Sequence, residues 1–179
     1  MATLFLILLA LGIIALVASH IYSGILREKR EAEDARRTAG ITGISVTLDV
    51  EEKHSLFILL AADGSINRLG TGTADNTENH LFIGKTKPAI FESVRSHVTP
   101  EMWDVMGRAF WDKNPLGPSC KLTILFHFKD GKSNGFEFRY GAESEGPPRE
   151  VADFVRAAVS ATDPWYEDFK QAAAAQKRS

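Results

Sequence analysis

The sequence predicts an α+β fold: an N-terminal transmembrane helix, then one antiparallel-sheet domain of about five to six strands with helices mainly on one face. Three observations lead to this prediction. The chain opens on a long uncharged apolar run, several later segments alternate apolar and polar residues, and amphipathic helical segments stand between and after them. Strands joined by short turns are typical of antiparallel sheets, and grouped helices are typical of a sheet covered on one side.

The first 26 residues form the expected anchor. Residues 2–26 contain no Asp, Glu, Lys or Arg, and as a helix they would extend roughly 37 Å, enough for a hydrocarbon core of about 30 Å. The competing interpretation is a cleaved secretory signal, for which residues 17–19 offer small side chains near a cleavage site. Because the segment before the apolar run lacks basic side chains, we favour a retained transmembrane anchor over residues 1–26.

Basic residues directly after the span predict its orientation. Arg27, Lys29 and Arg30 follow it, and only the α-amine precedes it. Since Lys and Arg stay on the cytoplasmic side of a membrane, we expect a cytoplasmic C-terminal domain, or a secreted or periplasmic one if the segment is cleaved. Tyr22 suits the headgroup region, so it joins the three basic residues as a membrane-interface residue. Residues 27–40 are expected to form a charged helical stalk.

Composition bounds the rest of the chain. Residues 41–170 are enough for one α+β domain with a real core, and residues 171–179 are expected to form a basic flexible tail. The chain has 21 basic and 23 acidic side chains; without residues 27–37, which hold five and four, 16 and 19 remain, a formal charge of −3. This sign predicts no nucleic-acid binding. The single Cys120 excludes an intrachain disulfide.

Alternation, an apolar run and a turn signal predict the first strands. Residues 44–51 alternate apolar and polar side chains, residues 55–62 are apolar on both faces, and Asp63-Gly64 predicts a hairpin turn into residues 65–70. These three segments are expected to form an antiparallel meander. Residues 80–84 are a candidate fourth strand.

A second strand pair is expected from residues 121–128 and 135–140. A two-residue Asp-Gly turn between them would pair Ile124 with Glu137 on the wrong face, so we expect an odd-length loop or a bulge.

Helices are expected in two groups. Residues 87–98 and 100–110 carry apolar side chains at helical spacing, as do residues 149–161. Asp163 and Pro164 then predict the start of a separate last helix.

Two groups of residues are candidates for function. His127, Glu137 and Arg139 should share one polar sheet face, where they would suit proton transfer or anion binding, or would simply form a polar surface. Trp165, Tyr166 and Phe169 would form a partner-binding aromatic patch, unless this helix docks on its own domain.

No motif in the sequence predicts a metal, a cofactor or a reaction. The histidines lack metal-site spacing, Cys120 has no cysteine partner, and no nucleophile stands in a known motif. Whether the chain is an enzyme stays open, with the sequence leaning against it. We therefore expect a single-pass membrane protein whose domain binds a protein partner or itself. The alternatives are a tethered enzyme or small-ligand binder and an exported soluble domain.

Overall fold

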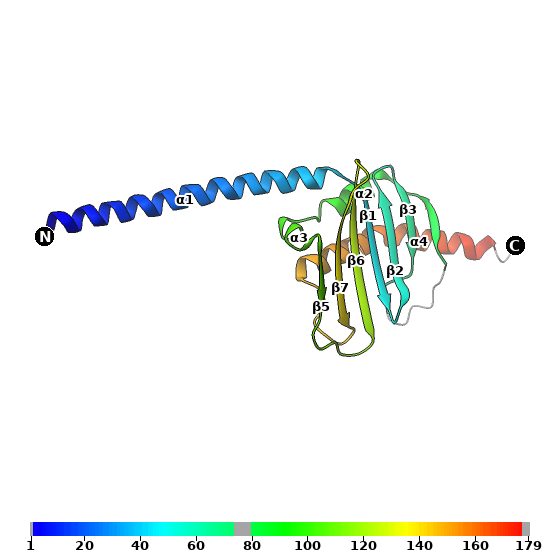
Figure 1. Ribbon diagram of the computed structural model, residues 1–179. Helices are drawn as coiled ribbons and strands as arrows, with labels where there is room; N and C mark the ends of the chain where they lie inside the picture. Colours follow the sequence, from blue (N-terminus) through cyan, green and yellow to red (C-terminus); the bar gives the residue numbers. More distant parts are fainter. Residues whose placement is uncertain (1, 74–79, 177–179) are drawn as a thin grey trace. The chain divides into compact units, whose positions relative to one another are not determined.

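The computed structural model describes residues 2–73 and 80–176 (Figure 1). The chain divides into two compact units between residues 39 and 40. The first unit is one helix, α1 (Ala2–Ala39). Judged on the residues whose side chains are described, no helix of the chain is both long and apolar enough to cross a membrane. Most of the span predicted for residues 1–26 lies outside that set, because up to residue 18 only the Leu16 side chain is described.

The charged part of α1 is tied together by ion pairs one turn apart. Arg27 Nε lies 2.7 Å from Glu31 Oε1. Arg30 Nε lies 3.9 Å from Asp34 Oδ2, and Arg37 Nε lies 3.9 Å from Glu33 Oε1. Such i,i+4 pairs stabilise a solvated helix by a few tenths of a kcal/mol, roughly, each. The residues of the predicted stalk are therefore helical up to Ala39.

The second unit is built on a seven-stranded mixed sheet that is mostly antiparallel. Its spatial order is β4-β3-β2-β1-β6-β7-β5, and among the described strand pairs only β5–β7 is parallel. The strands are β1 (Ile41–Val50), β2 (Lys53–Ala61), β3 (Ser65–Leu69), β4 (Phe82–Lys85), β5 (Arg108–Trp111), β6 (Ser119–Phe128) and β7 (Ser133–Gly141). The predicted α+β class is confirmed, with more strands than the expected five to six.

The core lies between one face of this sheet and three helices: α2 (Pro88–Arg95), α3 (Pro100–Val105) and α4 (Arg149–Gln176). Figure 1 shows α4 running behind the sheet. Alternate strand residues such as Ile44, Ile58 and Ile124 are fully buried there and pack in one cluster with Phe91 and Phe154 from the helices. Burial of this apolar area is the main force that holds the sheet to its helices.

The loop between β6 and β7 has the predicted register. Ile124 pairs with Phe136, and the last pair is His127 with Ser133, which leaves five residues between them. Gly131 has a φ of 80°, a conformation that glycine adopts without steric cost. All core-facing side chains of the two strands therefore stay on the same face, as expected.

The helix predicted over residues 100–110 is wrong in its second half. α3 ends at Val105, Gly107 has a φ of 79°, and β5 begins at Arg108. Strand pairing with β7 satisfies backbone groups at the edge of the sheet, and Phe110 packs 5.7 Å from the Phe136 ring. The apolar residues that suggested one helix therefore reach the core from α3 and from β5.

The predicted break at Pro164 is also wrong, because α4 runs through it. A proline inside a helix removes one hydrogen bond and costs about 3 kcal/mol. Here Phe154 and Ala158 before Pro164 and Tyr166 after it are all buried in this unit, which favours one continuous helix. Residues 171–176 of the predicted flexible tail belong to α4, and residues 177–179 lie outside the described residues.

Candidate functional site

The candidate site is the face of the sheet opposite α2, α3 and α4, called here the open face. Because side chains alternate along a strand, the residues between the core positions point to this face. Strand register aligns them in rows: Phe57, Thr47, Thr123 and Glu137 form one row across β2, β1, β6 and β7. No described helix of this unit covers the open face.

The open face carries four apolar side chains, called here the apolar centre: three on β2 and β3 and one on β6. Phe57, Leu59, Leu69 and Leu125 are half-buried there. Gly135 lies opposite Leu125, and a Cβ on this glycine would be 2.7 Å from Leu125 Cδ2, so its absence makes room for the leucine. A solvated sheet face usually carries polar residues at such positions, so this apolar centre is a feature to be explained.

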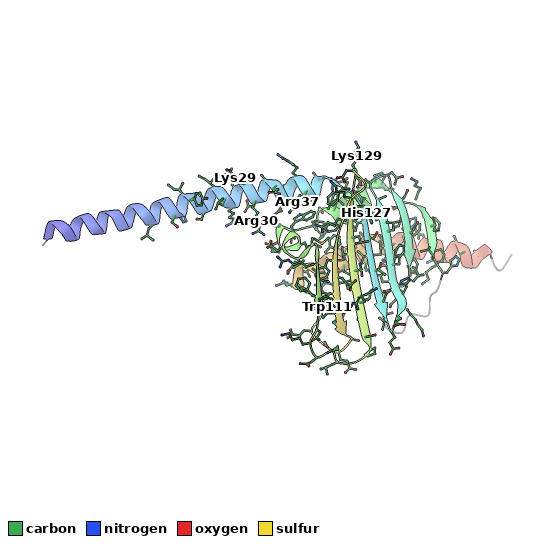
Figure 2. All side chains as sticks on the ribbon, viewed as in Figure 1. Lys29, Arg30, Arg37, Trp111, His127 and Lys129 are labelled. Carbon is green, nitrogen blue, oxygen red and sulfur yellow. The ribbon has the colours of Figure 1, made fainter. Side chains whose placement is uncertain are left out.

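His127 lies at the upper end of the open face in Figure 2, between two serines. Its Nε2 is 2.8 Å from Ser45 Oγ, and its Nδ1 is 2.8 Å from Ser133 Oγ. Both ring nitrogens are therefore satisfied by hydroxyls. Ser45 lies on a central strand paired on both sides, so neighbouring backbone N–H groups are not free to stabilise an oxyanion. This arrangement fixes the orientation of the ring.

Glu137 and Arg139 form a separate cluster. Arg139 Nε donates to Glu137 Oε1 at 2.7 Å, and both side chains are partly exposed. Glu137 pairs with Thr123, four residues along β6 from His127, which is about 13 Å at 3.3 Å per residue. The three predicted residues thus share one face, but His127 does not contact the other two.

A charged row crosses the lower end of the open face, at Trp111 in Figure 2. His54 hydrogen-bonds to Asp49, and Lys121 Nζ lies 3.5 Å from Asp49 Oδ2. In the strand register, Arg139 lies next to Lys121 on β6 and next to Trp111 on β5. A groove of about 490 Å³ lies here, with Glu52 and Asp112 on its rim. The sequence signal for this row is weak, because its members come from five strands.

Cys120 and Tyr140 also line this groove. Burial raises the pKa of the Cys120 thiol. Burial, together with the neighbouring Cys120, raises the pKa of Tyr140 to about 12. Both groups therefore stay protonated at neutral pH, and neither is activated as a nucleophile or a base.

The predicted aromatic patch lies largely within its own domain. Tyr166 is 1% exposed, and Trp165 Nε1 donates to the Lys85 carbonyl oxygen at 3.0 Å. Phe169 packs on Trp165 and is 38% exposed. The structure thus favours the alternative that this part of α4 docks on the sheet, and only Trp165 and Phe169 keep area for a partner.

Arg68 is a buried charged residue that the sequence analysis did not single out. Its side chain is 0% exposed on the core face of β3 and donates to Thr162 Oγ1 at 2.9 Å and Asp163 Oδ1 at 2.8 Å. Its guanidinium lies 5.2 Å from the Tyr166 ring centroid, and burial lowers its pKa. The buried Arg68 side chain therefore fills the space between β3 and α4 and contacts both. Its place beside Ile66 in the alternating pattern of β3 is the one signal in the sequence.

Among the described residues, no group of three or more His, Cys, Asp or Glu side chains could hold a metal ion. Comparisons with protein-family models, with curated proteins and with solved structures find no match for this chain.

Proposed function

We propose that this chain is a single-pass membrane protein whose α+β domain binds a protein partner on the cytoplasmic side, through the open face. The observation that carries the proposal is the apolar centre of that face: Phe57, Leu59, Leu69 and Leu125, with no described helix of the unit over them. The buried counterparts on the other face are covered by α2, α3 and α4. A sheet covered on one side only, with apolar residues on the other, is suited to a further layer.

The pattern of polar residues around this centre favours a protein as that layer. Protein interfaces have an apolar core and a polar rim. His127, Glu137 and Arg139 lie around the apolar centre, and Ser45 lies within it, between Leu59 and Leu125. Lys121 and Arg139 stand beside Asp49 and Glu137, so the rim has both signs of charge. An anionic lipid surface or a nucleic acid would require one dominant positive sign.

The membrane anchor of this proposal rests on residues 1–26. Residues 2–26 contain no charged side chain, and α1 is helical throughout. Arg27, Lys29 and Arg30 at its end support a cytoplasmic domain, with Tyr22 at the interface.

A matched pair of photocrosslinking positions tests which surface binds the partner. A photoreactive phenylalanine analogue is placed at Phe57, on the open face, or at Phe169, on the aromatic patch, in the full-length chain in its native host. The proposal predicts a discrete adduct from position 57 and none from position 169. It also predicts that Leu125→Glu abolishes the adduct, because a carboxylate would be buried in the interface.

The outcomes separate the two surfaces. An adduct from position 169 alone would assign binding to the aromatic patch and contradict the open face. Adducts from neither position, or adducts that survive Leu125→Glu, would also contradict it.

Small-ligand binding is a second candidate, favoured by the groove at Trp111. It has the size of a ligand pocket and contains both carboxylates and cationic groups, including Asp112 and Lys121. The raised pKa values of Cys120 and Tyr140 argue for binding rather than catalysis there.

A further inference from the structure

The sheet ends in two edge strands that differ in their protection. At β4, α4 covers part of the edge, because the Trp165 side chain donates to the Lys85 carbonyl oxygen. β5 pairs with β7 on one side and with no described strand on the other. Unpaired backbone groups at a sheet edge are a template for another strand.

β5 is a short edge strand of four residues that includes Arg108, but it lacks other protection. It contains no Lys or Pro, and Trp111 is 63% exposed. Arg108, at its start, and Asp112, directly after it, form no ion pair with any other described residue. The strand therefore carries an exposed aromatic residue between two opposite charges that lack an ionic partner.

The order of these residues makes the strand complementary to itself. When two copies of a strand pair antiparallel about a twofold axis, residues that lie opposite share a face. The axis therefore passes midway between the two copies of one residue, which lie opposite each other. With the axis at Phe110, Arg108 lies opposite Asp112 of the second copy, and Ala109 lies opposite Trp111. Each cation then meets a carboxylate, and each large side chain meets a small one.

The neighbouring registers lack this match. An axis at Ala109 places Arg108 opposite Phe110 of the second copy. An axis at Trp111 places Phe110, which faces the core, opposite the Asp112 carboxylate. The chemistry of the strand therefore selects a single register.

We propose that β5 pairs antiparallel with β5 of a second copy of this chain, with the twofold axis at Phe110, so that two sheets join into one. The interaction uses the edge of the sheet and leaves the open face to another partner. This proposal rests on the membrane anchor of the proposed function. A short strand pair buries less than the roughly 1,600 Å² of a standard interface, and a shared membrane raises the effective concentration of the two copies.

Cysteine pairs test the register directly. Full-length chains with Ala109→Cys and with Trp111→Cys, carrying different tags, are reconstituted together in lipid vesicles and exposed to a mild oxidant. Opposite residues of an antiparallel pair lie about 4.5–5.5 Å apart between Cα atoms, within disulfide range. The proposal predicts at least tenfold more disulfide-linked dimer in the mixture than in either variant alone, where the cysteines are offset by two residues. The buried native Cys120 is present in every sample and gives the background.

Charge reversal tests the ion pairs without a covalent bond. Arg108→Asp and Asp112→Arg each place like charges opposite each other, so either variant alone should self-associate at least tenfold more weakly than the wild type. An equimolar mixture of the two restores both opposite-charge pairs and should recover association. Energy transfer between labelled chains in vesicles measures it.

Each failure has a distinct meaning. Equal disulfide yields in the single variants and in the mixture, or a mixture of charge variants as weak as its components, would overturn the β5 pairing. The open-face variant Leu125→Glu should leave both results unchanged, so loss of partner binding and loss of self-pairing are told apart. If the chain does not enter vesicles, the membrane part of the proposed function fails, and the same mixtures at high concentration in solution still decide the pairing.

Discussion

At the scale of single residues, Arg68 shows how one buried cation organises an interface inside the domain. It connects β3 to Thr162, Asp163 and the Tyr166 ring on α4. Asp163 stays about half exposed and Thr162 also donates to the Ala158 carbonyl oxygen, so both keep partners when the arginine is removed.

We expect Arg68→Ala to lower the free energy of unfolding by about 2–5 kcal/mol, because it leaves a cavity beneath α4. Arg68→Met fills most of that space without a charge and should cost no more than about 1.5 kcal/mol. Urea unfolding of the two variants measures the difference. Equal losses would mean that the polar contacts, and not the filled volume, hold α4 in place.

Tyr140 predicts a loss of stability in alkali. Its folded-state pKa of about 12 lies above the value of about 10 of an exposed phenol. Between these values the unfolded chain has lost a proton that the folded chain retains, so stability is complete below about pH 10 and falls as the pH rises toward 12.

The Tyr140→Phe variant isolates this effect. Its unfolding free energy should fall less than that of the wild type between about pH 9 and pH 11.5. Urea unfolding at both pH values gives the comparison. Identical slopes in the two proteins would show that Tyr140 titrates normally in the folded state.

At the scale of elements, the β1–β2 hairpin has an unfavourable turn. Glu51 and Glu52 have φ values of 48° and 65°, between the paired residues Val50 and Lys53. A two-residue turn of this kind favours Asn-Gly, because other residues are strained in the left-handed region.

We expect the double change Glu51→Asn and Glu52→Gly to raise the free energy of unfolding by about 1–2 kcal/mol. The control, Glu51→Gln with Glu52→Gln, removes the charges but keeps the strain and should stay within about 0.5 kcal/mol of the wild type. Thermal unfolding compares them. Equal gains from both variants would assign the effect to charge repulsion instead.

Gly84 on β4 sets how closely α4 approaches the sheet. A Cβ at this position would lie 2.8 Å from Trp165 Cζ2 and 3.1 Å from Phe169 Cζ. Gly84→Ala should therefore push this part of α4 away and cost about 1–3 kcal/mol. Gly146→Ala, where a Cβ meets nothing within 4 Å, is the matched control in urea unfolding. A Gly84→Ala variant as stable as that control would contradict the close packing.

Local patterns in the sequence predicted the elements whose structure depends on neighbouring residues. Alternation located β1 and β6, an apolar run located β2, and the face argument gave the pairing of Ile124 with Phe136. β5 and the continuous α4 depend on long-range contacts, with β7 and with the core, that override the local signals of helical spacing and of Pro164.

The candidate site was predictable to a similar extent. His127, Glu137 and Arg139 share a face because they alternate with core residues. Their separation into two clusters follows from the register, which places Ser45 and Ser133 beside His127.

At the scale of the whole molecule, the proposed role depends on where the two units lie in the cell. A domain held at the membrane by residues 1–26 would meet partners and other copies at high local concentration. Cleavage of that segment would instead release the domain as an exported protein, with a different set of ligands.

The most direct test is a topology measurement on the full-length chain with a C-terminal tag, expressed in its native host. Mass, membrane fractionation and protease sensitivity are measured in spheroplasts and in inverted membrane vesicles. The proposed function predicts an intact, membrane-bound chain whose domain is cut only in inverted vesicles. A soluble exported chain that lacks about 18–19 N-terminal residues would contradict it.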